Sequence, residues 1–217
     1  NFKERFSQAV KETETVVYSY LPEETGHQKT IFEAMNYSVK AGGKRLRPLL
    51  MREVYRLFGG NGPEIEPFMA AMEMIHTSSL IHDDLPCMDN DEYRRGKLTT
   101  WKAYGYDMAV LAGDALMIYA FETASKAFSM GADPAKVGRA IGILAEKTGI
   151  YGMIGGQTVD VELTGKAVPR EKLDFIYRLK TGALLEASMM IGAVLAGATV
   201  EEIKEVETMA SEVGLAF

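Results

Sequence analysis

Residues 81–92 read IHDDLPCMDNDE and follow an apolar run with helical spacing. They place five carboxylates within ten residues, around Pro86. Like charges crowded this closely repel one another, and a protein tolerates them where a cation lies among them. Carboxylate oxygens without paired His or Cys ligands suit a hard cation, Mg²⁺ first. The stretch therefore predicts a magnesium site at the end of a helix.

The next residues, RRGK at 94–97, add three cations in four positions. Carboxylates that hold Mg²⁺ beside fixed positive charge are typical of a site for a polyphosphate, whose charge the metal and the guanidinium groups share. His76 lies two helical turns before Asp83 on the same face, so it is a candidate donor to a second phosphate group. The alternative for His76 is a hydrogen-bonded core histidine, and we expect that ordinary role for His82.

Pro86 decides how the acidic residues meet. On a continuous helix, Asp89 would lie about 240° round from Asp83, too far to share an ion. Proline lacks an N–H and clashes with the preceding turn, so a regular helix is not expected here. We predict that the chain bulges at 85–88 and returns Asp89 beside Asp83. A solvated acidic loop is the alternative, which the apolar residues at 85–88 disfavour.

Three further stretches are candidates for ligand contacts. GGKRLRP at 42–48 has two glycines that allow close backbone approach, then a helix start, with Lys44 and Arg47 able to aim at one anion. It lacks the Gly-Lys-Ser/Thr pattern of a Walker loop, and a solvated helix start is equally compatible. GGQTVD at 155–160 puts Gln157 and Asp160 on one helix face. KTG at 180–182 puts a cation and a hydroxyl at a possible helix break; either of these two stretches could also be a polar interruption of a core helix.

Apolar residues recur with helical spacing almost throughout, and no convincing strand pattern is present. The sequence predicts one all-α domain spanning 1–217. The expected helices run over about 2–20, 27–41, 48–58, from 64 to the acidic stretch, over 107–130, from Asp133-Pro134, within 149–165, from Pro169 to 180, and from Thr199, which we expect to act as an N-cap.

Composition bounds the functional classes. The chain has 217 residues, 47% of them hydrophobic, and a formal net charge of -6, which argues against general nucleic-acid binding. The single Cys87 excludes an internal disulfide and a multi-cysteine zinc site and fits a reducing cytoplasm. The apolar stretch 181–198 contains Glu186 and many Ala and Gly residues, so we expect a buried helix rather than a membrane span.

Taken together, these motifs identify the chain as resembling the trans-isoprenyl diphosphate synthases, also called polyprenyl synthetases, in the group that contains farnesyl and geranylgeranyl diphosphate synthases. The resemblance is carried by GGKRLRP at 42–48, EMIHTSSLIHDDLPCMDND at 73–91, RRG at 94–96, LAGDAL at 111–116, GGQTVD at 155–160 and KTG at 180–182. It covers nearly the whole chain. It implies an all-α isoprenoid-synthase bundle around a deep apolar cavity, a cytoplasmic location and a homodimer.

The resemblance also assigns residues to two substrates, an allylic diphosphate and isopentenyl diphosphate. It implies two or three Mg²⁺ ions in the complete enzyme, held here by Asp83 and Asp89 with support from Asp84. Contacts to the allylic diphosphate are expected from Arg94, Gln157, Lys180 and Thr181, with Asp160 ordering Lys180. Contacts to isopentenyl diphosphate are expected from Lys44, Arg47, His76 and Arg95.

Product length is expected to depend on Ser78 and Ser79, the fifth and fourth residues before the first Asp, which floor the tail pocket in this family. Many bacterial farnesyl enzymes carry an aromatic residue there, so the two serines leave a fifteen-carbon farnesyl product only slightly favoured over a twenty-carbon geranylgeranyl product. The family's second Asp-rich motif follows a Gly-Leu-Ala-Phe-like helix, and the sequence stops at Phe217. We therefore expect the 217 residues alone to lack a complete metal site and to be nearly inactive.

Three other classes compete with this interpretation. A terpene cyclase would share the Asp-rich helix but would not need GGKRLRP and His76. An HD-type phosphohydrolase would need more histidine ligands than the sequence offers, because the only one besides His76 and His82 is His27. A non-catalytic subunit of a heteromeric synthase is disfavoured by the intact set of Asp83, Asp84 and Asp89.

Overall fold

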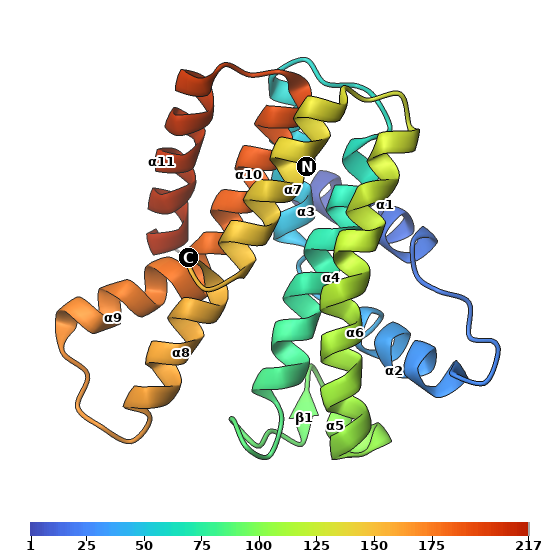
Figure 1. Cartoon of the computed structure of the whole chain (residues 1–217), viewed down its shortest axis with the longest axis vertical. Coiled ribbons are helices and arrows are strands. Elements are labelled where there is room, and N and C mark those ends of the chain that lie inside the picture. The colour runs from blue at the N-terminus through green and yellow to red at the C-terminus, as the bar shows by residue number, and fades with distance from the viewer. Residues whose placement is uncertain (217) are drawn as a thin grey trace. The chain divides into compact units, whose positions relative to one another are not determined.

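The computed structural model describes residues 1–216 and is built almost entirely from helices (Figure 1). The chain divides into two compact units, one formed by residues 1–45 and 70–124 and the other by residues 46–69 and 125–216. The all-α prediction is confirmed. Each unit is described by itself below.

The first unit contains the acidic stretch. Its elements are α1 (Phe2–Ser19), α2 (Lys29–Val39), most of α4 (Ile65–Asp83), β1 (Tyr93–Arg94), β2 (Lys97–Leu98), α5 (Thr100–Tyr104) and α6 (Tyr106–Ser125). Helices α4 and α6 lie side by side (Figure 1), since the Thr123 hydroxyl donates to the Met74 sulfur at 3.6 Å. Close approach near the end of α4 needs Gly113, because a Cβ there would lie 2.1 Å from Nε2 of His82. His82 is half-buried against α6, and its Nε2 lies 3.3 Å from the Val110 carbonyl oxygen and 3.5 Å from Oδ1 of Asp114, which agrees with the hydrogen-bonded role expected from the sequence.

The second unit is organised around α10. Its elements are α3 (Leu46–Leu57), the short 3₁₀ helix η1 (Lys126–Ser129), α7 (Pro134–Thr148), α8 (Met153–Leu163), α9 (Arg170–Ile176), the π-helix η2 (Tyr177–Gly182), α10 (Ala183–Ala196) and α11 (Val200–Ala216). Every residue from Ala183 to Leu195 is buried, and α3, α7 and α11 pack around this helix. A Cβ on Gly192 would lie 2.3 Å from the Met51 carbonyl oxygen, so glycine allows α3 and α10 to touch.

Helix starts follow the capping residues expected from the sequence. The Asp133 carboxylate accepts a hydrogen bond from the Ala135 amide at 2.9 Å, with Pro134 as the first helical residue. At Thr199, the hydroxyl accepts from the Glu202 amide at 3.2 Å and the Glu202 carboxylate accepts from the Thr199 amide at 2.7 Å. This reciprocal pair is a capping box.

The expectation that the chain has no strand is wrong in one place. Strands β1 and β2 form a two-stranded antiparallel hairpin that pairs Tyr93 with Leu98 and Arg94 with Lys97. Its two turn residues, Arg95 and Gly96, both have positive φ (52° and 77°), as a tight type I′ turn requires. Strands of two residues are too short to show an alternating pattern, so no periodic signal predicts them.

Two helical segments, Tyr106–Ser129 and Arg170–Ala196, are long and apolar enough to cross a membrane by length and composition alone. This is weak evidence, because core helices of soluble proteins meet the same criteria. In the second segment 78% of the apolar window is buried within the protein. The prediction of a buried helix after residue 181 is therefore confirmed.

Candidate functional site

The acidic stretch leaves α4 and turns back on itself. The Asp89 amide donates to the Asp83 carbonyl at 2.8 Å, and the amides of Met88 and Asn90 both donate to the Leu85 carbonyl, at 2.8 and 3.1 Å. Helix α4 ends at Asp83, before the proline, as expected. The predicted bulge is thus confirmed: its hydrogen bonds return the backbone of Asp89 to that of Asp83.

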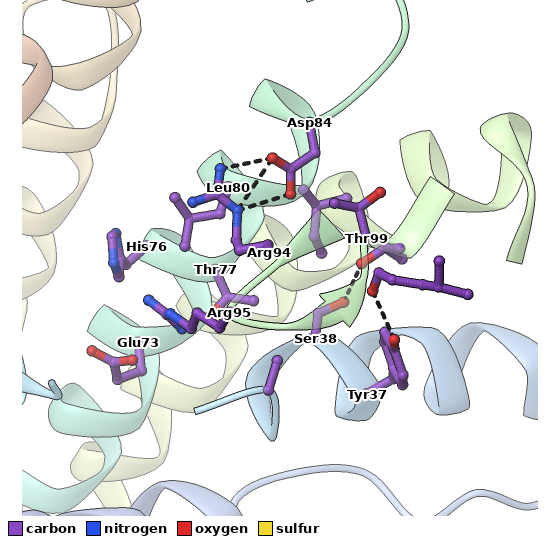
Figure 2. A pocket seen from close by; sticks show the side chains of 14 residues that line it. Tyr37, Ser38, Glu73, His76, Thr77, Leu80, Asp84, Arg94, Arg95 and Thr99 are labelled. Atoms are coloured by element: carbon purple, nitrogen blue, oxygen red, sulfur yellow. Dashed lines mark hydrogen bonds and ion pairs between the residues drawn. The ribbon is translucent and has the colours of Figure 1, made fainter. Parts of the chain in front are cut away.

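The neighbouring carboxylate, Asp84, is buried and forms a forked ion pair with Arg94 (Figure 2). Nε of Arg94 donates to both carboxylate oxygens, at 2.9 and 3.2 Å, and Nη2 donates to Oδ1 at 2.7 Å. The bond to Asp84 is the largest influence on the pKa of Arg94, which is raised despite partial burial. The pair fixes the start of the hairpin against the end of α4.

These contacts divide the three aspartates into two kinds. Asp84 is occupied by Arg94, so it orients a cation of the protein. Asp83 is half-buried and Asp89 is exposed, and both offer hard oxygen donors beside a shared backbone contact. That donor chemistry fits Mg²⁺. Within residues 1–216 no three acidic, His or Cys side chains are gathered as a metal cluster.

The GGKR loop that precedes α3 is the second part of the site in the first unit. Gly42, Gly43 and Arg45 all have positive φ, at 92°, 150° and 52°. Nη1 of Arg95 donates to the Gly42 carbonyl, and a Cβ on Gly43 would lie 3.1 Å from the same nitrogen. Glycine therefore lets the guanidinium of Arg95 lie flat against the loop that carries Lys44.

A pocket in the first unit lies between α4 and the hairpin (Figure 2). Its lining includes His76 on α4, Arg94 and Arg95 on the hairpin, and Asp84 and Glu73. Burial lowers the pKa of Arg95, and the nearby charge of Arg45 lowers it further. The structure thus brings together His76, Arg94 and Arg95, three of the residues expected to hold diphosphates, on one cavity.

The second unit holds another expected pair. Nζ of Lys180 donates to Oδ2 of Asp160 at 2.6 Å, as the proposed ordering of Lys180 by Asp160 requires. Lys180 and Thr181 lie in the π-helix, which is the predicted break in the helix; π-turns are frequent at functional sites. A Cβ on Gly156 would lie 2.5 Å from the Lys180 amide nitrogen, so glycine in GGQTVD lets α8 touch the π-helix. Gln157 is the next residue of α8.

The two serines of the expected tail pocket lie on α4. Ser78 is fully buried and its hydroxyl donates to the Ile75 carbonyl at 2.7 Å, and the Ser79 hydroxyl donates to the His76 carbonyl at 2.7 Å. Both hydroxyls therefore have acceptors within the helix, and both side chains are small.

Two important residues were not predicted from the sequence. Arg45 is buried inside the GGKR loop and pairs with Glu73, which is buried on α4. One signal was present: Glu73 is the only Asp, Glu, Lys or Arg between Glu66 and Asp83. A single charge in a long apolar helical run indicates a buried partner, because an unpaired buried carboxylate is very costly.

An acidic helix end, a forked arginine and a glycine-rich basic loop place the chain in a class of helical proteins with a charged site at the end of one long helix. Residues 28–217 match the polyprenyl synthetase family, and the chain belongs to that family. It is 48% identical over 188 residues to a chloroplastic geranylgeranyl pyrophosphate synthase of Capsicum annuum, covering 86% of this chain and 51% of that relative. It is 43% identical over 204 residues to a farnesyl diphosphate synthase of Geobacillus stearothermophilus, covering 94% and 68%.

Solved structures agree with this assignment. The fold is similar to that of an FPP/GFPP synthase from Zymomonas mobilis in its apo form, with a TM-score of 0.93 and 37% identity, covering 100% of this chain and 78% of that one. The isoprenoid-synthase fold is therefore confirmed. The chain spans about half the length of the plant relatives it matches.

Proposed function

We propose that the protein is a short-chain trans-prenyltransferase that condenses isopentenyl diphosphate with an allylic diphosphate, dimethylallyl or geranyl, to give farnesyl diphosphate. The observation that carries the proposal is the pocket in which His76, Arg94 and Arg95 meet next to the returned Asp83–Asp89 turn. One compact unit of the chain thus offers carboxylate oxygens and cationic side chains near one another, which is what a diphosphate with a divalent cation needs.

The first substrate would bind through its diphosphate. When bound to Asp83 and Asp89, Mg²⁺ supplies charge neutralisation for the leaving group. Arg94, oriented by Asp84, donates to this diphosphate. The resemblance to the family also assigns Gln157, Lys180 and Thr181 to the allylic substrate, and Asp160 orients Lys180. These donors stabilise the negative charge that develops as the allylic C–O bond breaks and leaves a delocalised carbocation.

The second substrate would be held by the separate basic set. Lys44, Arg47, His76 and Arg95 bind the diphosphate of isopentenyl diphosphate and orient its double bond toward the cation. The alkene supplies the electron pair of the new C–C bond, and a proton then leaves to the departed diphosphate. Apolar helix faces exclude the water that would quench the cation. No classical nucleophile of the protein is needed, which agrees with the absence of a Ser/His/Asp signal in the sequence.

The product length is the open part of the proposal. Relatives are named as geranylgeranyl, farnesyl and FPP/GFPP synthases. The small, internally bonded Ser78 and Ser79 favour a longer tail pocket, so geranylgeranyl diphosphate is the alternative product. We further propose a cytoplasmic homodimer; Leu111 and Ile118 on α6 are 55% and 72% exposed and would suit contact with a second copy.

The test supplies the complete protein with isopentenyl diphosphate, geranyl diphosphate and Mg²⁺, and measures chain length and pyrophosphate release. We expect prenyl diphosphates of fifteen or twenty carbons, formation that needs both substrates, and loss of turnover with chelator. Asp89→Asn should reduce turnover by about 100-fold or more, whereas Asp107→Asn, a matched exposed carboxylate on α6, should not. Hydrocarbon formed from geranyl diphosphate alone would instead indicate a terpene cyclase, and no turnover would indicate a non-catalytic subunit.

A further inference from the structure

Arg45 occupies an unusual position within the GGKR loop. Its side chain is only 1% exposed although its neighbour Lys44 is exposed. Its backbone φ of 52° lies in the left-handed region, which is disfavoured for a residue with a Cβ. A buried guanidinium on a strained backbone persists only where the surroundings hold it firmly. These features point to a structural task that the expected substrate contacts do not include.

The surroundings do hold Arg45 at each of its guanidinium nitrogens. Nη1 donates to the Glu73 carboxylate at 2.8 Å and Nε donates to Glu14 at 3.1 Å. Nη2 donates to the Tyr18 hydroxyl at 3.0 Å and to the Val39 carbonyl at 2.8 Å. Burial by itself would lower the pKa of Arg45, but Glu73 and Tyr18 outweigh it and the pKa is raised. Arg45 thus ties its loop to α1, to the end of α2 and to α4.

The ion pair with Glu73 connects Arg45 to residues that are expected to contact substrate. Glu73 precedes His76 by three residues on α4, so the two share a helix face, and both line the pocket. On the other side, Arg95 lies against Gly43 and donates to Gly42. Arg45 is therefore the connection between the backbone that carries Lys44, the loop surface that holds Arg95 and the helix that presents His76.

We propose that Arg45, acting through Glu73, is the positioning residue of the isopentenyl diphosphate half of the site. It touches no substrate itself. Its bonds fix the spacing of Lys44, His76 and Arg95, so that three donors from three elements meet one diphosphate group. The inference rests on the proposed function, because it takes isopentenyl diphosphate as the ligand of these three residues. It predicts an effect confined to one of the two substrates.

The test compares Arg45→Met with Lys147→Met in the complete protein. Both changes remove a cation that bridges two carboxylates; Arg45 is buried, whereas Lys147 is half-buried and pairs with Glu186 and Glu207 in the other unit. For Arg45→Met we expect the KM for isopentenyl diphosphate to rise about 10- to 100-fold, because small misplacements of binding groups have effects of this size. The KM for geranyl diphosphate should change less than about threefold, and Lys147→Met should leave both values near wild type.

A milder variant should give a smaller rise in the KM for isopentenyl diphosphate. Glu73→Gln keeps an oxygen acceptor for Arg45 and removes the charge, so its rise in KM for isopentenyl diphosphate should lie between those of wild type and Arg45→Met. Thermal unfolding of each variant is measured in parallel. If Arg45→Met lowers the melting temperature as Lys147→Met does but leaves the KM for isopentenyl diphosphate unchanged, or raises both KM values equally, the inference is overturned. If the wild-type protein forms no product from the two substrates, the proposed function fails first.

Discussion

Gly156 offers the sharpest test of how the second unit positions Lys180. It lies on α8, where an added Cβ would be 2.5 Å from the Lys180 amide nitrogen and 3.0 Å from the Leu179 carbonyl carbon. Favourable contacts between such atoms start at about 3.5 Å. In Gly156→Ala, α8 and the π-helix must therefore separate by roughly 0.5–1 Å, and both atoms met are backbone, which cannot rotate away.

The expected loss of stability follows from two opposing effects. Overpacking of this kind costs about 1–3 kcal/mol, and replacing a helical glycine by alanine returns up to about 1 kcal/mol. With the full offset, the net destabilisation should be up to about 2 kcal/mol, or up to roughly 8 °C in melting temperature for a protein of this size. Differential scanning calorimetry measures this shift.

The same separation should affect chemistry more than stability. Asp160 follows Gly156 on α8 and holds Lys180 at 2.6 Å. Moving the two helices apart stretches this bond and shifts Lys180 from the position in which we propose that it contacts the allylic diphosphate. We expect kcat to fall about 10- to 100-fold, with little change in the KM for isopentenyl diphosphate. Product formation in the complete protein under saturating substrates gives this value.

Gly142→Ala is the matched control. Gly142 lies on α7 in the same unit, and nothing approaches the position of its Cβ within 4 Å. This variant should be as active as wild type and more stable by up to about 1 kcal/mol. If Gly156→Ala behaves like Gly142→Ala in both measurements, the close approach of α8 to the π-helix is not required and the reasoning is refuted.

Three shorter predictions concern other residues. Asp84→Ala leaves Arg94, whose side chain is 33% exposed, without its carboxylate partner. The free energy of unfolding in urea should fall by about 1–2 kcal/mol, and by less in Asp84→Asn. Equal stability of wild type and both variants would contradict this prediction. The pKa of Lys147 is raised because its bonds to two carboxylates outweigh the effect of burial. The stabilisation from Lys147 is therefore present below pH 10.5, the ordinary pKa of lysine, and is lost as the pH rises through the raised pKa of the folded state. In Lys147→Met, the free energy of unfolding in urea should decline less steeply at alkaline pH. Ser78→Tyr should shorten the product read by chromatography, and an unchanged product distribution would remove Ser78 from the tail pocket.

Local chemistry made much of the site predictable from the sequence. Pro86 ended the helix and returned Asp89 to Asp83, and Thr199 began α11, because each effect depends on residues a few positions apart. The spacing of Gln157 and Asp160 placed both on one face of α8, whereas the pairing of Asp160 with Lys180, twenty residues further on, was expected only from the resemblance to the family and is seen in the structure. That contact depends on the π-helix, and nothing in the sequence distinguishes a π-turn from a regular helix. The pairing of Arg45 with Glu73 was missed for a similar reason, since both partners were judged from their own segments.

Backbone strain gives independent support for where the site lies. Among the described residues, Arg45, Asn90 and Arg95 are the only ones other than glycine with positive φ. All three fall in the two stretches, 42–48 and 83–97, that chemistry alone had marked as anion and metal sites. Each is held by specific bonds: the four of Arg45, the donation from the Asn90 amide to Leu85, and that from Arg95 to Gly42. Strain of this kind costs free energy and persists where the surrounding bonds hold it, so its occurrence in these two segments agrees with the proposed position of the binding site.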